Sequence, residues 1–189
     1  MKTILYCPGF QGREDDVYHK EFFELARQKG YNIKYVSINW KRTTINNWVD
    51  QLEQEILKYN LQDLILAGLS FGAMTSFLAA TKNNVSELWL LSLSPFFSDS
   101  KFVTHPSKID LRQVGRKRLN AFKSLNFVNL AQQIKPPTKV FCGSNELPET
   151  ITQARLVNKF IRNSELFVAK DAKHSLLDEK YLQAIAGNI

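Results

Sequence analysis

The sequence predicts an α/β protein built on a mostly parallel six-stranded sheet with helices on both faces. Two observations support this fold class. Short apolar runs alternate with segments whose apolar residues recur at helical spacing. The runs are also apolar throughout, which is typical of parallel strands buried on both faces. With 189 residues, of which 44% are hydrophobic, the chain can fill one core, so we expect a single domain over residues 1–189.

Each expected element has its own signal in the sequence. Strands are predicted at short apolar runs, helices at apolar residues three and four apart, and their ends at Gly or Pro. Pro8-Gly9 closes the first strand, for example, and Gly30 closes the first helix. In chain order we expect strand 3–7, a helix between Asp16 and Gly30, strand 31–38, helix 45–57, strand 63–67, helix 71–81, strand 87–93, strand 139–142, helix 152–162, strand 165–168 and helix 179–186.

Residues 94–137 interrupt this alternation and are too many for an ordinary connection. We expect a cap-like insertion between the fourth and fifth strands that covers a site or holds a pocket. Its phenylalanines either line an acyl pocket or seal the insertion against the sheet: Phe96, Phe97, Phe102, Phe122 and Phe127.

The insertion also holds most of the net charge of the chain. Only Asp99 and Asp110 oppose its eight basic residues, so it carries +6 of the total of +7. Such a segment favours an anionic substrate or carrier, or is simply a solvated face without a partner. The basic residues are Lys101, Lys108, Arg112, Arg116, Lys117, Arg118, Lys123 and Lys135.

The segment Gly68-Leu69-Ser70-Phe71-Gly72 has the pattern G-x-S-x-G, and its setting makes Ser70 a candidate nucleophile. The segment follows an apolar strand directly and opens a helix, which is the strand–turn–helix context that exposes a serine on a sharp turn. Glycines suit a turn in which the backbone is crowded. The start of the next helix offers free N–H groups that favour an oxyanion.

A serine nucleophile needs a base, and His174 is the best candidate. It follows the last predicted strand, so in a parallel sheet it shares an edge with Ser70. His19 falls in the first helix, where a surface or packing role is expected, and His105 falls in the insertion, where a loop role is expected.

The imidazole needs a carboxylate to hold its tautomer. The loop after the fifth strand supplies Glu146, which is our candidate. Glu149 is the rival, although a negative charge there also suits the first turn of the following helix.

The order Ser70, Glu146, His174 matches that of nucleophile, acid and base in α/β-hydrolases, and the chain resembles the small bacterial esterase-like members of that superfamily. The resemblance covers nearly the whole chain except the insertion. It implies a triad of these three residues, with the backbone N–H groups of Phe10 and Phe71 as oxyanion donors.

Two positions depart from the pattern common in that superfamily. Pro8-Gly9 stands where His-Gly is common, and Glu146 stands where Asp is more frequent. These departures favour one alternative from another class, a catalytically silent hydrolase fold that works as a binding module.

The resemblance implies a carboxylesterase that forms an acyl-enzyme on a small-molecule or acyl-chain ester. An acyl thioesterase acting on an acidic carrier is the enzyme alternative, supported by the basic insertion. We expect no metal, because histidines and cysteines lack ligand spacing, and no cofactor, because no dinucleotide or phosphate-binding motif is present. Nucleic acid is not an expected partner, since no recognised module accompanies the charge.

Cys7 and Cys142 close apolar runs, so we expect buried free thiols in a reducing compartment. The first residues are too short an apolar stretch for a signal peptide, and no run reaches the roughly 18 apolar residues of a membrane-spanning helix. We therefore expect a soluble cytoplasmic protein.

Overall fold

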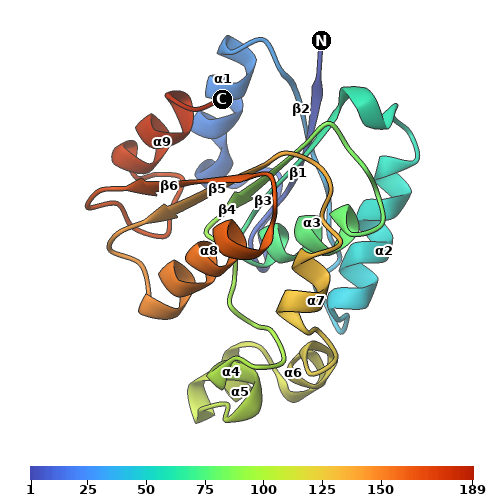
Figure 1. Cartoon of the computed structure of the whole chain (residues 1–189), viewed down its shortest axis with the longest axis vertical. Helices are drawn as coiled ribbons and strands as arrows, with labels where there is room; N and C mark the ends of the chain where they lie inside the picture. Colours follow the sequence, from blue (N-terminus) through green and yellow to red (C-terminus); the bar gives the residue numbers. More distant parts are fainter.

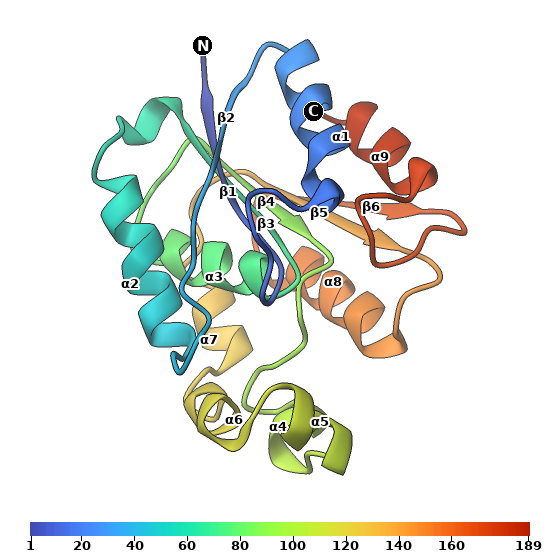
Figure 2. The ribbon, with the colours of Figure 1, turned by 180° about the vertical axis from the view of Figure 1, so that it is seen from behind.

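The computed structural model describes the whole chain, Met1–Ile189, and contains one sheet of six strands. All neighbouring strands are parallel, in the order β2-β1-β3-β4-β5-β6 (Figures 1 and 2). The predicted fold class is thus confirmed, with a sheet that is entirely parallel. The strands are β1 (Thr3–Cys7), β2 (Asn32–Tyr35), β3 (Leu64–Leu69), β4 (Glu87–Leu91), β5 (Thr138–Gly143) and β6 (Ser164–Ala169).

Helices cover both faces of this sheet. Figure 1 shows α1 and α9 on one face and α2, α3 and α8 on the other. The helices are α1 (Lys20–Gln28), α2 (Ile45–Ile56), α3 (Phe71–Ala80), α4 (Lys101–Thr104), α5 (Lys108–Gln113), α6 (Arg116–Phe122), α7 (Phe127–Ala131), α8 (Pro148–Phe160) and α9 (Glu179–Ala186), with 3₁₀ turns at Val17–His19 and Leu61–Asp63.

The core divides into two hydrophobic clusters because successive strand side chains point to opposite faces. In β1, Leu5 and Cys7 join the larger cluster, which also holds the buried residues of α2 and α3. Ile4 and Tyr6 join the smaller cluster, together with those of α1 and α9. The continuous apolar runs of the strands follow from this burial on both sides.

Most predicted elements end at other residues in the structure, and three of these differences have a clear physical reason. The run 31–38 forms a strand only at Asn32–Tyr35. In the neighbouring strand β1, Tyr6 pairs with Tyr35, and soon after it the chain reaches Pro8. Proline has no N–H, so the hydrogen-bond ladder stops there. The run 87–93 ends as a strand at Leu91, since Ser92 has a φ of 50°. The helix predicted at 152–162 is Pro148–Phe160, and it begins at a proline, a residue suited to the first helical turn.

Residues 94–137 hold the four short helices α4 to α7. Figure 1 shows α4, α5 and α6 at one end of the molecule, reached by the chain as it leaves β4. Three of the phenylalanines of the segment, Phe97, Phe122 and Phe127, are at most 2% exposed and belong to the core. Phe96 and Phe102 are only partly buried. Three of these rings thus seal the insertion against the core, whereas the other two remain partly accessible.

No helix is both long enough and apolar enough to cross a membrane.

Both cysteines are free and fully buried. Burial raises the pKa of the Cys142 thiol to about 11, and it raises the pKa of Cys7 further. Because the thiolate is the reactive form, we expect neither thiol to react with a dithiobis-nitrobenzoate reagent at pH 8 in the native protein. Both should react once guanidinium unfolds the chain. A thiol that reacts as fast in the native protein as in the unfolded chain would contradict the packing of β1 or β5 described above.

Candidate active site

The candidate residues gather where the strands end. Ser70 directly follows β3, Phe10 lies in the turn after β1, Glu146 follows β5 and His174 follows β6. Because β1 and β3 to β6 are consecutive neighbours in a parallel sheet, their carboxyl ends form one edge. The chain runs from β1 outward to β2 and then returns to β3, so this edge includes the point where the strand order reverses.

Ser70 lies on a sharp turn between β3 and α3. Its φ and ψ are 58° and −117°, a conformation that costs a non-glycine residue energy and is found mainly at functional sites. The N–H of Ser70 donates to the carbonyl of Leu91 in β4 over 2.9 Å, which fixes the turn against the sheet. The turn therefore carries the strain expected of a serine presented for chemistry.

Glycine at position 72 lets α3 approach the end of β1 closely. A Cβ atom at Gly72 would lie 2.1 Å from the carbonyl oxygen of Cys7 and 2.2 Å from that of Pro8. These distances are far inside contact range, and the obstacles are backbone atoms that cannot turn aside. No other residue fits here without moving the helix that begins at Ser70.

Two backbone N–H groups are free to face an anion beside Ser70. Phe71 is the first residue of α3, so its N–H has no partner within the helix. The N–H of Phe10 makes no hydrogen bond within the chain. Gly9, before it, lies close to Ser70, because a Cβ there would be 3.8 Å from the Ser70 Cβ. The rings of Phe10 and Phe71 pack edge to face at 5.7 Å.

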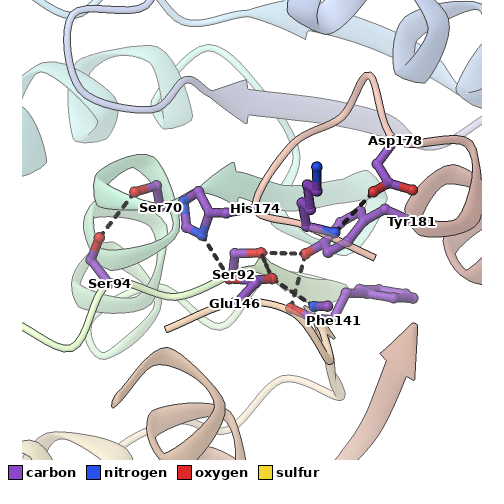
Figure 3. Close-up of polar contacts among 10 residues, drawn as sticks. Ser70, Ser92, Ser94, Phe141, Glu146, His174, Asp178 and Tyr181 are labelled. Atoms are coloured by element: carbon purple, nitrogen blue, oxygen red, sulfur yellow. Dashed lines mark hydrogen bonds and ion pairs between the residues drawn. The ribbon is translucent and has the colours of Figure 1, made fainter. Parts of the chain in front are cut away.

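His174 and Glu146 are in close hydrogen-bond contact. The Nδ1 of His174 lies 2.6 Å from Oε2 of Glu146, whose side chain is fully buried, whereas the His174 side chain is 40% exposed. Figure 3 shows the imidazole ring between Ser70 and Glu146. Glu149, the rival carboxylate, lies in the first turn of α8 and pairs with Lys101 instead. Lys101 also lowers the pKa of Glu149.

The other oxygen of Glu146 is held by two further donors. The backbone N–H of Gly143 and the hydroxyl of Ser92 each approach Oε1 to 2.6 Å. A carboxylate only accepts hydrogen bonds, so the Ser92 hydroxyl donates its proton to Glu146. The hydroxyl of Tyr181 lies 2.7 Å from Ser92 and 3.0 Å from the carbonyl of Phe141, and its single proton is then shared between these two acceptors (Figure 3).

Tyr181 can act as this donor because its hydroxyl keeps its proton. Burial, and then the nearby Glu146 carboxylate, raise the pKa of Tyr181 well above its usual value. Every oxygen of the buried carboxylate thus faces a donor, as burial of a charged group requires. The arrangement fixes Glu146 in place and leaves its second oxygen to His174.

The hydroxyl of Ser70 forms its hydrogen bond with Ser94 rather than with His174. The two serine oxygens are 3.0 Å apart, and no hydrogen bond joins Ser70 to the imidazole. Ser94 stands at the start of the insertion, just beyond the end of β4. The carboxyl ends of parallel strands share one edge of the sheet, which is the reasoning that identified His174. The same reasoning could have placed Ser94 near Ser70, since β4 is the direct neighbour of β3.

Ser92 and Tyr181 are the other residues that sequence reasoning missed. Ser92 follows β4, so the edge argument applies to it as well. Tyr181 lies on α9, the last helix, and no local signal distinguishes it from any core tyrosine.

The remaining histidines have other roles. His19, predicted within the first helix, ends the preceding 3₁₀ turn and is 4% exposed. Its Nδ1 lies 3.0 Å from the hydroxyl of Tyr6 in the core, and burial lowers its pKa. His105 is exposed at the end of α4. Neither contacts Ser70. No group of three or more His, Cys, Asp and Glu side chains is arranged to hold a metal ion.

Two cavities meet at Ser70 and His174. One, of about 290 Å³, extends under the insertion and is lined largely by apolar side chains, among them Phe10, Phe71, Phe96 and Phe102. The other, of about 430 Å³, lies on the opposite side of the same two residues, along the turn 9–12 that follows β1. A substrate held at Ser70 thus has room on both sides of the reacting atom.

Comparison with known proteins supports the fold but not a family. No protein-family profile matches the chain, and no curated protein matches it. Among solved structures, Est1E from Butyrivibrio proteoclasticus superposes with a TM-score of 0.82 at 14% identity, over 98% of this chain and 84% of that one.

Two further structures are similar over most of their length. A lipase-esterase related protein from Clostridium acetobutylicum has a TM-score of 0.69 at 19% identity, covering 98% of this chain and 92% of its own. An α/β hydrolase, MGS-MChE2, from a lagoon-sediment metagenome has a TM-score of 0.72 at 16% identity, covering 94% and 84%. At these identities the likeness shows the α/β-hydrolase fold.

The close approach at Gly72 leads to a first prediction about this site. Gly72→Ala should lower the free energy of unfolding by about 3 kcal/mol, because the added methyl group overpacks against fixed backbone. Gly187→Ala is the matched control, since a Cβ there meets nothing closer than 3.6 Å. Urea unfolding measures both. Equal stabilities for the two variants would disprove the close approach of α3 to β1.

A second prediction concerns the hydroxyl that faces Glu146. Ser92→Ala should cost about 1.5–3 kcal/mol of stability at pH 7, the range for hydrogen bonds to charged groups. Ser76→Ala is the comparison, because Ser76 is equally buried but donates to the neutral carbonyl of Ala67, and about 1 kcal/mol is expected for it. If Ser92→Ala proves the milder substitution in urea unfolding, Glu146 does not depend on this donor.

Proposed function

We propose that this chain, which has the α/β-hydrolase fold, is a serine hydrolase that cleaves carboxylic esters through an acyl-enzyme. The single observation that carries the proposal is the contact of His174 with the buried Glu146, beside a serine on a strained turn. A base oriented by a carboxylate next to an exposed serine is the arrangement that nucleophilic catalysis by serine requires.

The first step would be attack by Ser70 on the ester carbonyl. Because Glu146 holds Nδ1 of His174, the other ring nitrogen, Nε2, is left to take the serine proton. For this the Ser70 side chain would exchange its hydrogen bond with Ser94 for one with His174. The alcohol then leaves with the proton carried by His174.

The negative charge that develops on the carbonyl oxygen needs fixed donors. The free N–H groups of Phe10 and Phe71 supply two, and the positive end of the α3 dipole adds to them. Both donors belong to the backbone, which accounts for the tolerance of Pro8 where histidine is common. Water activated by His174 would release the acyl group in the second step.

The cavity under the insertion fits the acyl part of the substrate. Its lining by Phe10, Phe71, Phe96 and Phe102 favours an apolar or aromatic acyl group of modest size. Est1E, whose structure is similar, has been solved with ferulic acid bound. Aryl and short-chain acyl esters are therefore the substrates to test first.

A fluorophosphonate probe tests the nucleophile. We expect the wild-type protein to be labelled covalently at Ser70, and Ser70→Ala to remain unlabelled. His174→Ala should be labelled at least a hundredfold more slowly, because the serine loses its base. Ser94→Ala controls for loss of a neighbouring hydroxyl and should keep its label. If the wild-type chain is not labelled while folded, the fold is catalytically silent and the hydrolase proposal is wrong.

The two candidate carboxylates can be separated by their amides. Glu146→Gln should lower kcat for an aryl ester by about 10³–10⁴-fold, the effect known for amide replacement of a triad acid. Glu149→Gln should leave kcat within about twofold, because Glu149 pairs with Lys101 at the surface. Ester hydrolysis at pH 7.5 measures both, and the reverse order of effects would move the role of the acid to Glu149.

A further inference from the structure

A second groove opens beside the Ser70 site, along the turn that follows β1. It has a volume of about 860 Å³ and shares Gln11 and Gly12 with the 430 Å³ cavity that contains Ser70 and His174. Its walls are the loop after β1, the loop that connects β2 to α2, and one residue of α6, Arg118. It therefore extends the cavity opposite the one assigned to the acyl group.

The groove is rich in positive charge. Four cationic side chains line it, Arg13, Lys41, Arg42 and Arg118, against two carboxylates, Glu14 and Asp15. Asp15 is engaged by Arg13, with contacts of 3.1 Å. Lys41, Arg42 and Arg118 have no carboxylate within ion-pair distance.

Arg118 is the most firmly held of these cations. Its Nε donates to the carbonyl of Thr43 over 3.0 Å, Nη1 to Val114 over 2.9 Å, and Nη2 to the carbonyl of Trp40. Its guanidinium also stacks over the ring of Phe10, 4.9 Å from the centroid. The side chain is therefore fixed and partly buried. It stacks on the ring of Phe10, whose backbone N–H is a proposed oxyanion donor.

These contacts use three of the five N–H donors of the guanidinium. One N–H on each terminal nitrogen remains, and arginine can bind a carboxylate with two N–H donors. Desolvation lowers the pKa of Arg118, yet an arginine remains charged at neutral pH. A fixed cation without a counter-ion, in a groove open to solvent, is suited to an anion brought by a ligand.

We infer that this groove binds a carboxylate on the alcohol part of the ester, with Arg118 as the main contact and Lys41 and Arg42 as supporting charges. The inference rests on the proposed function, because it assigns the two sides of the substrate relative to Ser70. The apolar cavity under the insertion takes the acyl group, and the alcohol extends past Gln11 and Gly12 into the groove. Arg118 is then a specificity-determining residue.

The test compares two butyrate esters of matched shape, that of 4-hydroxybenzoate and that of 4-hydroxybenzamide. They share the acyl group and the aryl ring, and only the first carries a carboxylate on the leaving group. The ratio of their kcat/KM values, each divided by the rate at which the ester hydrolyses in buffer, reports on the groove, because both esters use the same nucleophile and oxyanion donors and the intrinsic reactivity of the leaving groups cancels. We expect the wild-type ratio to favour the carboxylate ester about tenfold or more.

Variants then locate the effect. Arg118→Gln should reduce the ratio about tenfold, and Lys41→Gln about threefold, because Lys41 is exposed and partly screened. The Lys41 side chain makes no contact that stabilises the fold, so this variant keeps the test valid if Arg118→Gln does not fold. Lys123→Gln removes an exposed charge from the same segment outside the groove, and it should leave the ratio unchanged.

Ionic strength supplies an independent readout. Raising the salt concentration from 0.05 to 0.5 M should lower the wild-type ratio by screening the groove, and should change the Arg118→Gln ratio less. A wild-type ratio near one, or an equal loss in Lys123→Gln, would overturn the inference while leaving the hydrolase proposal intact. If neither ester is hydrolysed, the failure lies in the proposed function instead.

Discussion

The contact between Gly72 and the carbonyl groups of Cys7 and Pro8 is the constraint on which the site depends. It lets the first turn of α3 rest directly on the end of β1, with no side chain between them. Ser70 and the free N–H of Phe71 are thereby held beside the turn that carries Phe10. The proposed nucleophile and both proposed oxyanion donors are thus positioned by backbone packing between two neighbouring strands, before any polar side chain takes part.

The buried carboxylate of Glu146 imposes the second requirement. A charge removed from water is tolerated only where donors replace the lost hydration. Gly143, Ser92 and His174 supply them, and Tyr181 supports Ser92 in turn. Residues from the ends of β4, β5 and β6 and from α9 must therefore meet at one point. Through Tyr181 and Phe141 the polar network joins the site to the smaller hydrophobic cluster.

The sequence was sufficient for those features that depend on local pattern or on the geometry of a parallel sheet. The six strands, the turn at Ser70 and the meeting of Glu146 with His174 all follow from apolar runs and from the rule that carboxyl ends share an edge. The end of β2 could not be predicted, because Val36 and Ile38 are apolar and buried like strand residues. The strand ends only because β1 offers no hydrogen-bond partner past its own end. Tyr181 was missed because its contact is distant in sequence. The groove at Arg118 combines two loops and one residue of α6, which no motif connects.

The position of Tyr181 on α9 has a consequence for synthesis on the ribosome. A chain emerges from its N-terminus, so β1, β3 and α3 are available to pack long before the segment around residue 181 is made. A partly synthesised protein can therefore form the serine turn while Glu146, His174 and the tyrosine that supports their network are still missing. Under the proposed function, Ser70 gains its base and buried acid only when α9 docks, which delays assembly of the site until the chain has been translated beyond residue 181.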